Sequence, residues 1–497
     1  MKAIVTCFIA FLYPVLIQAK TLHIGTGQSY QTLSGAAADA VPGDSILFHT
    51  GVYAGGEFVN GLQGGEDRPI HIVAQAGAEV IIRGGTNSWQ LSDAAYLHIE
   101  GFIFENQTGN GFNMDDGGDY TTPTHHITFR YCTFRDISAS GNNDLLKLSG
   151  VDDFKILDCT FINGSLGGSG IDMVGCHQGE IVRNHFENMG SNAIQAKGGS
   201  RQITIEKNFF KNCGQRSLNL GGSTGLQYFR PIDATYEAAE IYVICNIFIG
   251  SVAPVAFVGC VRSAFVHNTI IRPEKWVLRI LQETVDPERF EACGNNIFRN
   301  NLIYKNNSVS TDCNIGPDTA PETFIMSNNL WYNEQLPGNS TPVGIPVTDQ
   351  NQVTGQNPML NNVNEEDLSI PVSSPATGAG YPGISPDMDY IDHPYADPPS
   401  IGAFEGNPAI SNVMADEAIF APVIYPNPAR QGVYISWSGI QIQEAILEVT
   451  DMRGTRISGK VITNGYLWRN TAHLTGLYFF RISVDGKQVC IKKVMLF

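Results

Sequence analysis

The sequence predicts an all-β fold in which a long solenoid precedes a small β-sandwich. Six short apolar segments recur between Asn143 and Glu283, and each is a candidate strand. Side chains alternate across a strand, so when one residue points inward its neighbours point outward. The inward residues are Leu148, Met173, Ala196, Leu220, Phe257 and Ile280. The outward column is then Lys147, Asp172, Gln195, Asn219, Ala256 and Arg279, with Lys197 beside it.

A second periodic pattern supports the solenoid. Asn or Cys recurs at Cys132, Cys159, Asn184, Asn208, Asn246, Asn268, Asn300 and Asn328. The residue two further on is apolar each time: Phe134, Phe161, Phe186, Phe210, Phe248, Ile270, Leu302 and Leu330. The residue three before is also apolar: Phe129, Ile156, Ile181, Ile205, Val243, Phe265, Ile297 and Ile325. The intervals run from 22 residues (246 to 268) to 38 residues (208 to 246), which is typical of stacked repeats.

Each repeat contains strand-like runs and turns and no helical periodicity of about ten residues, so we expect β coils. Stacked Asn, Cys and Phe with Gly at the corners resemble the right-handed parallel β-helix of the pectate-lyase-like superfamily. The resemblance covers residues 20–405 and implies a fold, whereas chemistry has to be argued from the site. Residues 30–40 could form a short amphipathic helix that caps the open end, because an uncovered end is an unpaired apolar edge.

The N-terminus indicates export. Lys2, an apolar run through Ile17 and the small residue Ala19 predict a signal peptide over residues 1–19. Ten cysteines, of which Cys7 lies in this segment, leave an odd number of nine, so no disulfide framework is evident. The net charge of −17 argues against nucleic acid as a partner. We expect a monomer.

One acidic run could hold a cation. Asp115, Asp116 and Asp119 lie on a glycine-rich turn, and Ca²⁺ prefers clustered carboxylates. Calcium is therefore a possible cofactor. The spacing does not fit an EF-hand loop, and the alternative is an ordinary solvated turn.

Two insertions interrupt the ladder, at residues 212–240 and 272–294. Their residues Tyr228, Arg230, Lys275 and Trp276 combine flat apolar faces with cations, which suits sugar rings and carboxylates. Long loops on a rigid scaffold often carry function. The alternative is that Trp276 and Phe229 plug the side of the solenoid.

The polar strip has the residue types needed for β-elimination of a uronic acid polymer. The reaction needs a group that neutralises a carboxylate and a base that removes the neighbouring proton. Lys197, with Gln195 and Asn219 on adjacent coils, has suitable neighbours. The strip also resembles the chondroitinase B and alginate lyase family, which places a Lys base on one strand and an Arg on the next coil. The resemblance implies that Lys197 is the base. The expected Arg position falls near Gly221, and Arg216 is the nearest candidate.

Other functions stay open. Asp172 could pair with Lys197 as an ordinary salt bridge, and Asp172, Gln195, Asn219 and Arg279 could simply bind sugar. A hydrolase needs two facing carboxylates, and the column offers only Asp172. The main rival is a non-catalytic polysaccharide-binding or adhesion protein. A lyase predicts a Lys197 that is free of Asp172.

The C-terminal fifth differs in composition. The series ending at residues 401–405 resembles the closing coil of a β-helix, and residues 406–420 form a linker. Alternating strands in residues 421–497 predict a small antiparallel sandwich. Its motifs, including Tyr425-Pro426-Asn427-Pro428 and the terminal Lys492-Lys493-Val494, resemble the type IX secretion sorting domain. This resemblance implies export through the periplasm to the cell surface or medium. A carbohydrate-binding sandwich is the alternative.

Overall fold

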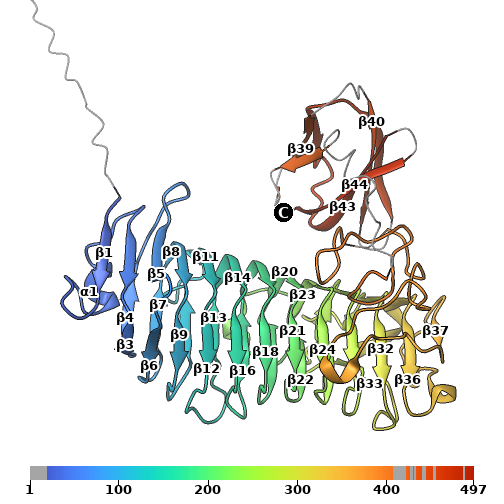
Figure 1. Ribbon diagram of the computed structural model, residues 1–497, viewed down its shortest axis with the longest axis horizontal. Coiled ribbons are helices and arrows are strands. Elements are labelled where there is room, and N and C mark those ends of the chain that lie inside the picture. The colour runs from blue at the N-terminus through green and yellow to red at the C-terminus, as the bar shows by residue number, and fades with distance from the viewer. Residues whose placement is uncertain are drawn as a thin grey trace, which may run out of the picture.

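A computed structural model describes residues 19–383, 386–406, 421–425, 429, 432–438, 444–451, 455–484 and 487–496. The predicted signal peptide over residues 1–19 and the linker over 406–420 lie almost wholly outside the described residues. Figure 1 shows a long β-helix with a compact β domain on one side. No helix in the described ranges is long and apolar enough to cross a membrane.

Three parallel sheets form the walls of a right-handed parallel β-helix, which confirms the predicted fold class. We call them sheets A, B and C. Sheet A contains β1 (Thr21–Ile24), β2 (Ser45–Phe48), β5 (Ile70–Ala74), β8 (Ala95–Glu100), β11 (Thr124–Arg130), β14 (Val151–Leu157), β17 (His177–Val182), β20 (Ser200–Glu206), β23 (Ala238–Ile244), β26 (Cys260–Val261), β27 (Ala264–Val266), β30 (Cys293–Gly294), β31 (Ile297–Arg299), β34 (Thr319–Ala320) and β35 (Ile325–Ser327).

Sheet B contains β3 (Gly51–Ala54), β6 (Val80–Arg83), β9 (Ile103–Glu105), β12 (Thr133–Arg135), β15 (Thr160–Ile162), β18 (His185–Glu187), β21 (Phe209–Lys211), β24 (Ile247–Ile249), β28 (Thr269–Ile271), β32 (Leu302–Lys305), β36 (Leu330–Asn333) and β37 (Val353–Thr354). Sheet C contains β4 (Glu57–Asn60), β7 (Trp89–Ser92), β10 (Phe112–Asp115), β13 (Leu146–Ser149), β16 (Ser169–Val174), β19 (Asn192–Lys197), β22 (Arg216–Gly221), β25 (Ala253–Val258), β29 (Leu278–Leu281) and β33 (Cys313–Ile315).

Side chains of the same kind stack on one another inside the solenoid. Phe134, Phe161, Phe186, Phe210 and Phe248 form a column with ring centroids 4.7–4.9 Å apart. These rings are fully buried. The column follows directly from the predicted repeat, because residues in equivalent positions of successive coils lie one strand spacing apart.

A buried asparagine ladder runs beside the phenylalanines. The side-chain oxygen of Asn208 accepts hydrogen bonds from the backbone N–H (2.8 Å) and the side-chain amide (2.9 Å) of Asn184. The same pattern continues through Asn246 and Asn268. Each ladder amide also donates to a backbone carbonyl, so these buried polar groups are satisfied.

The predicted register was wrong by one residue in the last two coils. Asn301 and Asn329 continue the ladder, whereas Asn300 and Asn328 take left-handed backbone angles at the turn, with φ of 55° and 53°. The stacked residues are consequently Ile303 and Trp331, rather than Leu302 and Leu330. Likewise Phe298 and Met326 face the core in place of Ile297 and Ile325. The Asn-Asn doublets hid the slip, and a one-residue slip turns every side chain to the opposite face.

The N-terminal end is capped as predicted. Helix α1 (Leu33–Ala37) begins after Thr32, whose side chain accepts a hydrogen bond from the N–H of Gly35. Leu33 and Ala36 are fully buried against the first coils. The helix thereby covers the apolar end of the solenoid.

The other end differs from the prediction. The last strand of the solenoid is β37, and the described part of residues 355–406 contains one short 3₁₀ turn, η4 (Val363–Glu365), and isolated β-bridges but no further strand. Instead of forming a closing coil, Ile401, Ala403 and Phe404 pack with Ile247 and Leu302 on the outer surface of sheet B. Apolar outward residues on that sheet explain this lateral packing. The other 3₁₀ turns are η1 (Leu226–Tyr228), η2 (Pro321–Thr323) and η3 (Pro337–Asn339).

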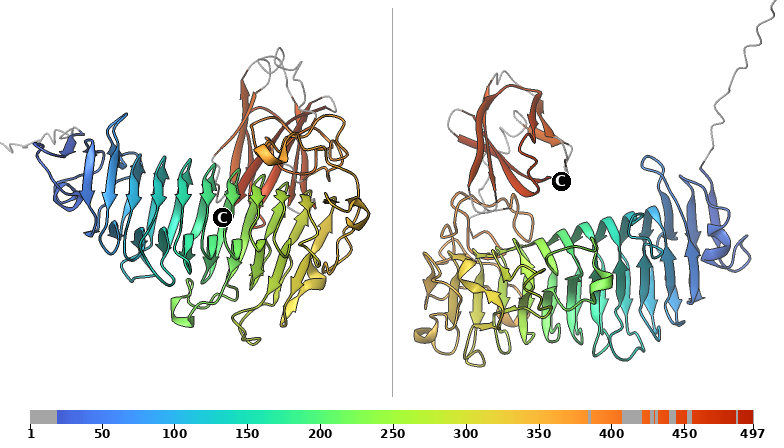
Figure 2. Two further views of the ribbon diagram at one scale, coloured as in Figure 1. Left: turned by 60° about the horizontal axis from the view of Figure 1, so that its bottom comes forward. Right: turned by 180° about the vertical axis from the view of Figure 1, so that it is seen from behind.

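The C-terminal domain is a small antiparallel sandwich, as expected. One sheet contains β38 (Ala421–Tyr425), β39 (Gly432–Ser438) and β42 (Tyr466–Arg469). The other contains β41 (Arg456–Ile462), β40 (Ala445–Asp451), β43 (Gly476–Val484) and β44 (Lys487–Leu496). Figure 2 shows this domain from two further sides. Eight cysteines of the β-helix are buried, and none of these eight forms a disulfide bond.

The ladder ends on a carboxyl group whose titration should affect stability. Asp349 accepts hydrogen bonds from the Asn329 amide (3.0 Å) and the Trp331 indole (2.8 Å), and burial raises the pKa of its carboxyl to about 6. An unfolded Asp titrates near 4. The stability that the protonated Asp349 carboxyl contributes is therefore fully present below about pH 4 and is lost as pH rises through about 6. We predict that Asp349→Asn raises the free energy of unfolding by about 2 kcal/mol at pH of about 8, and less at pH of about 4. Urea unfolding at both pH values checks this, with the exposed Asp67→Asn as control. An Asp349→Asn variant that is equally destabilised at both pH values would contradict it.

Candidate functional site

The outer surface of sheet C carries the predicted polar strip. Strand pairing aligns Lys147 with Asp172, Asp172 with Gln195, and Gln195 with Asn219. It continues through Ala256 to Arg279. A second outward column pairs Ser149 with Val174 and Val174 with Lys197. The predicted register of the strip is therefore confirmed, but its middle is covered, because Asp172, Gln195, Asn219 and Ala256 are all buried.

Two lysines share one buried carboxylate at the N-terminal end of the strip. The ammonium of Lys147 makes a short contact with Oδ2 of Asp172, and the ammonium of Lys197 lies 3.4 Å from Oδ1. The Asp172 side chain is 1% exposed, against 20% for Lys147 and 13% for Lys197. Lys197 is thus paired with Asp172. It is not the free lysine that a lyase predicts. Lys197 has the longer of the two contacts.

A second carboxyl lies behind this group. Asp144 is buried and accepts a hydrogen bond from the N–H of Ser169 (2.7 Å). Burial, followed by the nearby Asp172, raises the pKa of Asp144 to about 7. Burial would lower the pKa of Lys147, but Asp172 and Asp144 raise it overall, so Lys147 is a firmly protonated cation. Asp144 is not among the predicted site residues, although it precedes the β13 segment by only two residues.

The lysines open into a cavity of about 360 Å³ beside the strip. Its wall comes from the turn after β10 and the insertion after β22. The hydroxyl of Tyr120 on the turn donates to the carbonyl of Gln227 on the insertion (3.0 Å), so the two loops meet. The remaining lining includes Asp116, Lys147, Ser149, Lys197, Thr224, Tyr228 and Arg230. Tyr228 is 57% exposed at this wall and can contact a ligand.

Glu237 anchors the insertion beside Lys197. Its carboxylate is completely buried and accepts hydrogen bonds from the N–H of Gly198 (2.9 Å) and the N–H of Thr224 (2.8 Å). The hydroxyls of Thr224 (2.7 Å) and Thr284 (2.5 Å) donate to it as well. Four donors converge on one anion, and the contact with Gly198 ties them to the residue after Lys197. This role could not be seen in the sequence, because the donors come from three separate segments.

Arg230 holds the insertion in place rather than pointing a free charge into the cavity. Its guanidinium makes two hydrogen bonds to Asp152, at 2.7 and 2.6 Å, and a third to the carbonyl of Gly175. The pKa of Asp152 falls to about 2, since hydrogen bonds from Arg230 and His177 outweigh its burial. Arg230 therefore pins the insertion to sheet A and lines the cavity with an already satisfied cation. Phe229 is fully buried against Phe290, so for this residue the plug interpretation is correct.

The other predicted binding residues gather farther along the strip. The Trp276 ring contacts Lys275 and Arg279, whose cationic groups lie 4.2 and 4.7 Å from its centroid. Arg279 also donates to the side chain of Asn314 (3.0 Å). Burial, followed by the neighbouring Arg216, lowers the pKa of Arg279. This end of the strip is a second cationic region.

Arg216 does not accompany Lys197. Arg216 pairs with Asn192 at the start of the strand, five residues before Lys197, which is about 16 Å along the sheet. Its guanidinium donates to Asn219 (2.8 Å) and Glu283 (2.8 Å). The guanidinium of Arg216 therefore reaches the middle of the strip at Asn219, and it also neighbours Arg279.

The acidic turn does not form a ready cation site. Asp115 accepts from Gln90, Asn113 and the N–H of Gly117, while Asp119 accepts from Thr121. Asp116 accepts from the N–H of Gly118, and its other oxygen is buried without a hydrogen bond. Within the described residues, no three His, Cys, Asp or Glu side chains converge. These three carboxylates face different turn amides and do not fit a shared Ca²⁺.

Comparison with protein families separates the two parts of the chain. Residues 76–229 match the model of the right handed beta helix region, and residues 423–496 match the secretion system C-terminal sorting domain. The C-terminal sandwich is a type IX secretion sorting domain. The protein is therefore exported, for release or for attachment at the cell surface, and the secretion machinery is its partner. No curated protein sequence matches the chain.

Solved structures with a similar architecture include several lyases. Pectate lyase Pel9A has 12% sequence identity and a TM-score of 0.49, with 78% of this chain and 96% of that chain covered. A mannuronic acid specific polysaccharide family 6 lyase from human gut microbiota has 13% identity and a TM-score of 0.45, with 65% and 82% covered. An alginate lyase from Paenibacillus sp. str. FPU-7 has 15% identity and a TM-score of 0.37, with 60% and 96% covered.

The contacts of Glu237 predict that its carboxylate is needed to hold the insertion after β22 in place. In Glu237→Gln the amide nitrogen cannot accept hydrogen bonds, so at least one pair of donors loses its acceptor. Hydrogen bonds to a charged group contribute about 1.5–3 kcal/mol each, and we expect a loss of about 3 kcal/mol in the free energy of unfolding. Denaturant unfolding measures this loss, and hydrogen exchange of residues 222–230 should accelerate. The control is Glu283→Gln at a half-exposed ion pair. Equal stability of the two variants would show that Glu237 is not an anchor.

Proposed function

We propose that this exported protein binds an acidic polysaccharide along the strip of sheet C and cleaves it by β-elimination beside Lys147 and Lys197. The observation that carries the proposal is the convergence of two lysines and the exposed Tyr228 on one cavity at the N-terminal end of the polar strip. A chain of uronic acid residues is long and anionic, and it matches a linear surface with cations. Export through the sorting domain brings the protein to such polymers.

The chemistry assigns different roles to the two lysines. Lys147, held protonated by Asp172 and Asp144, neutralises the uronate carboxylate and makes the adjacent C–H more acidic. Lys197, whose contact with Asp172 is the longer one, is the candidate base: as the neutral amine it accepts this proton, and the ammonium that forms is stabilised by Asp172. The electron pair forms a carbon–carbon double bond as the glycosidic C–O bond breaks. The leaving oxygen takes a proton from the Tyr228 hydroxyl at the cavity wall.

Non-catalytic binding is the second candidate, and a specific contact favours it. A lysine that stays paired with Asp172 is a cation that binds carboxylates and removes no proton. The same strip would then hold a glycan for adhesion. The two functions differ in whether an unsaturated product forms.

The first prediction from the proposal concerns Lys197. Purified protein is incubated with alginate, pectate and glycosaminoglycans, with calcium or with a chelator, and the ultraviolet absorbance of unsaturated product is followed. We expect product from at least one polymer, and a loss of at least about 100-fold in Lys197→Ala. Lys155→Ala on sheet A is the matched control and should retain full activity. Binding of a polymer without product in the wild-type protein would establish the adhesion function instead.

The second prediction concerns the distant cationic region. Arg279 lies three coils from Lys197, which is about 14 Å at the strand spacing, so it contacts a different sugar of the same chain. We expect Arg279→Ala to raise KM for long chains by roughly tenfold, as for a lost charged contact, with kcat unchanged. KM for a disaccharide-sized substrate should not change. An equal effect on short and long substrates would show that Arg279 acts at the cleavage site or on the fold.

A further inference from the structure

The outer surface of sheet A changes character along the solenoid. In the first coils the outward residues in one register column are His71, His98, Thr128, Lys155, Glu180 and Thr204. The same column then continues as Tyr242, Ala264, Ile297 and Ile325. The polar residues are partly or fully exposed, whereas Tyr242 is 4% and Ala264 is 1% exposed. Outward apolar residues on a β-helix need a cover.

Strand β43 of the sorting domain also carries apolar residues on the face that points away from its own core. Tyr478, Phe480 and Ile482 face the core of the sandwich. Leu477 and Phe479 face the opposite way, yet they are only 5% and 3% exposed. A strand of a small two-sheet domain normally alternates between apolar and polar residues. Its apolar outer residues therefore serve a contact outside the sandwich.

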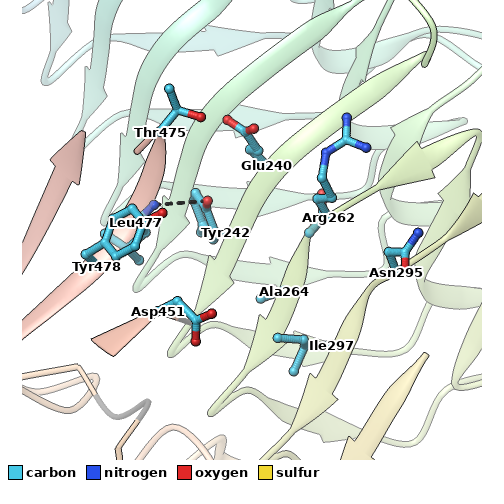
Figure 3. Close-up of a pocket in the computed structure, with 11 residues that line it drawn as sticks. Glu240, Tyr242, Arg262, Ala264, Asn295, Ile297, Asp451, Thr475, Leu477 and Tyr478 are labelled. Atoms are coloured by element: carbon cyan, nitrogen blue, oxygen red, sulfur yellow. Dashed lines mark hydrogen bonds between the residues drawn. The ribbon is translucent and has the colours of Figure 1, made fainter. Parts of the chain in front are cut away.

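The two surfaces pack directly against each other (Figure 3). Leu477 and Phe479 share one buried cluster with Tyr242, Ile244, Ala264, Val266 and Ile297. The N–H of Leu477 donates to the hydroxyl of Tyr242 (3.1 Å). A methyl group added at Gly476 would lie 2.7 Å from the same hydroxyl, so this position needs glycine for the close approach.

A polar border surrounds the apolar contact. Figure 3 shows Glu240 and Arg262 of the β-helix beside Asp451 and Thr475 of the sorting domain, around a cavity of about 180 Å³. Farther away, the ammonium of Lys492 lies 3.5 Å from the carboxylate of Asp387. An apolar centre with a polar border is the usual composition of a specific protein interface.

We propose that the outer surface of β23, β27, β31 and β35 is a docking site for the sorting domain of the same chain. The β-helix therefore presents its secretion signal in one fixed orientation, and the two domains move as one body. Because β43 is covered by the β-helix, the secretion machinery meets the other surfaces of the sorting domain. The proposal does not depend on the glycan site, which lies on sheet C. It rests on two apolar surfaces that both point away from the core of their own domain.

The test uses the full-length chain with Tyr242→Asp, which places a charge in the centre of the contact. Thr204→Asp is the matched control, because Thr204 is the partner of Tyr242 in the preceding coil and is only partly buried. We expect faster amide hydrogen exchange of residues 476–484 and a larger radius of gyration by small-angle scattering for Tyr242→Asp. The control should match the wild type in both measurements.

A milder variant keeps the proposal testable if Tyr242→Asp fails to fold. Tyr242→Phe keeps the ring and removes only the hydroxyl that accepts from Leu477. We expect its Leu477 amide to exchange at least about tenfold faster, with exchange in the sandwich core unchanged. Unchanged exchange at Leu477 in Tyr242→Phe would overturn the proposal, as would a wild-type scattering profile of two independently moving domains.

Discussion

Every coil of this β-helix can bury its apolar side chains only against the coils on either side of it. The register between coils is therefore the constraint on which the rest of the structure depends. It is held by parallel backbone pairing, by the stacked phenylalanine column from Phe134 to Phe248, and by an asparagine ladder that satisfies its own buried amides. A polar ladder of this kind fits only one alignment, because a shift would leave buried amides without partners.

Fixed register also makes the outside of the solenoid regular. Residues in one outward column lie about one strand spacing apart, so the sequence can present a line of functional groups to a linear polymer. At the N-terminal end of the strip, Lys147 and Lys197 are held by the buried Asp172, with Asp144 behind them. The shared carboxylate holds the two ammonium groups together beside one cavity, which a protein surface of separate charges would not do.

The two loop systems around the cavity show how irregular segments acquire defined positions. The insertion after β22 is held by Glu237 at one side and by the Arg230–Asp152 pair at the other. Both anchors are charged groups held by several hydrogen bonds, and Glu237 and Arg230 are buried. The same principle applies to the sorting domain, where an apolar strand face and an apolar face of sheet A cover each other.

The sequence by itself determined the solenoid, its polar strip and the C-terminal sandwich, because each depends on short-range alternation and on a period that repeats along the chain. It could not distinguish Asn300 from Asn301, since both members of a doublet satisfy the pattern and only packing of Ile303 and Trp331 selects one. Only the tertiary structure decided that Arg230 is bound by Asp152 and that Arg216 lies apart from Lys197. It also decided that Asp144 and Glu237 belong to the site and that Ile297 faces the sorting domain. These contacts join residues far apart in the chain, and no local pattern records which distant partner a side chain will meet.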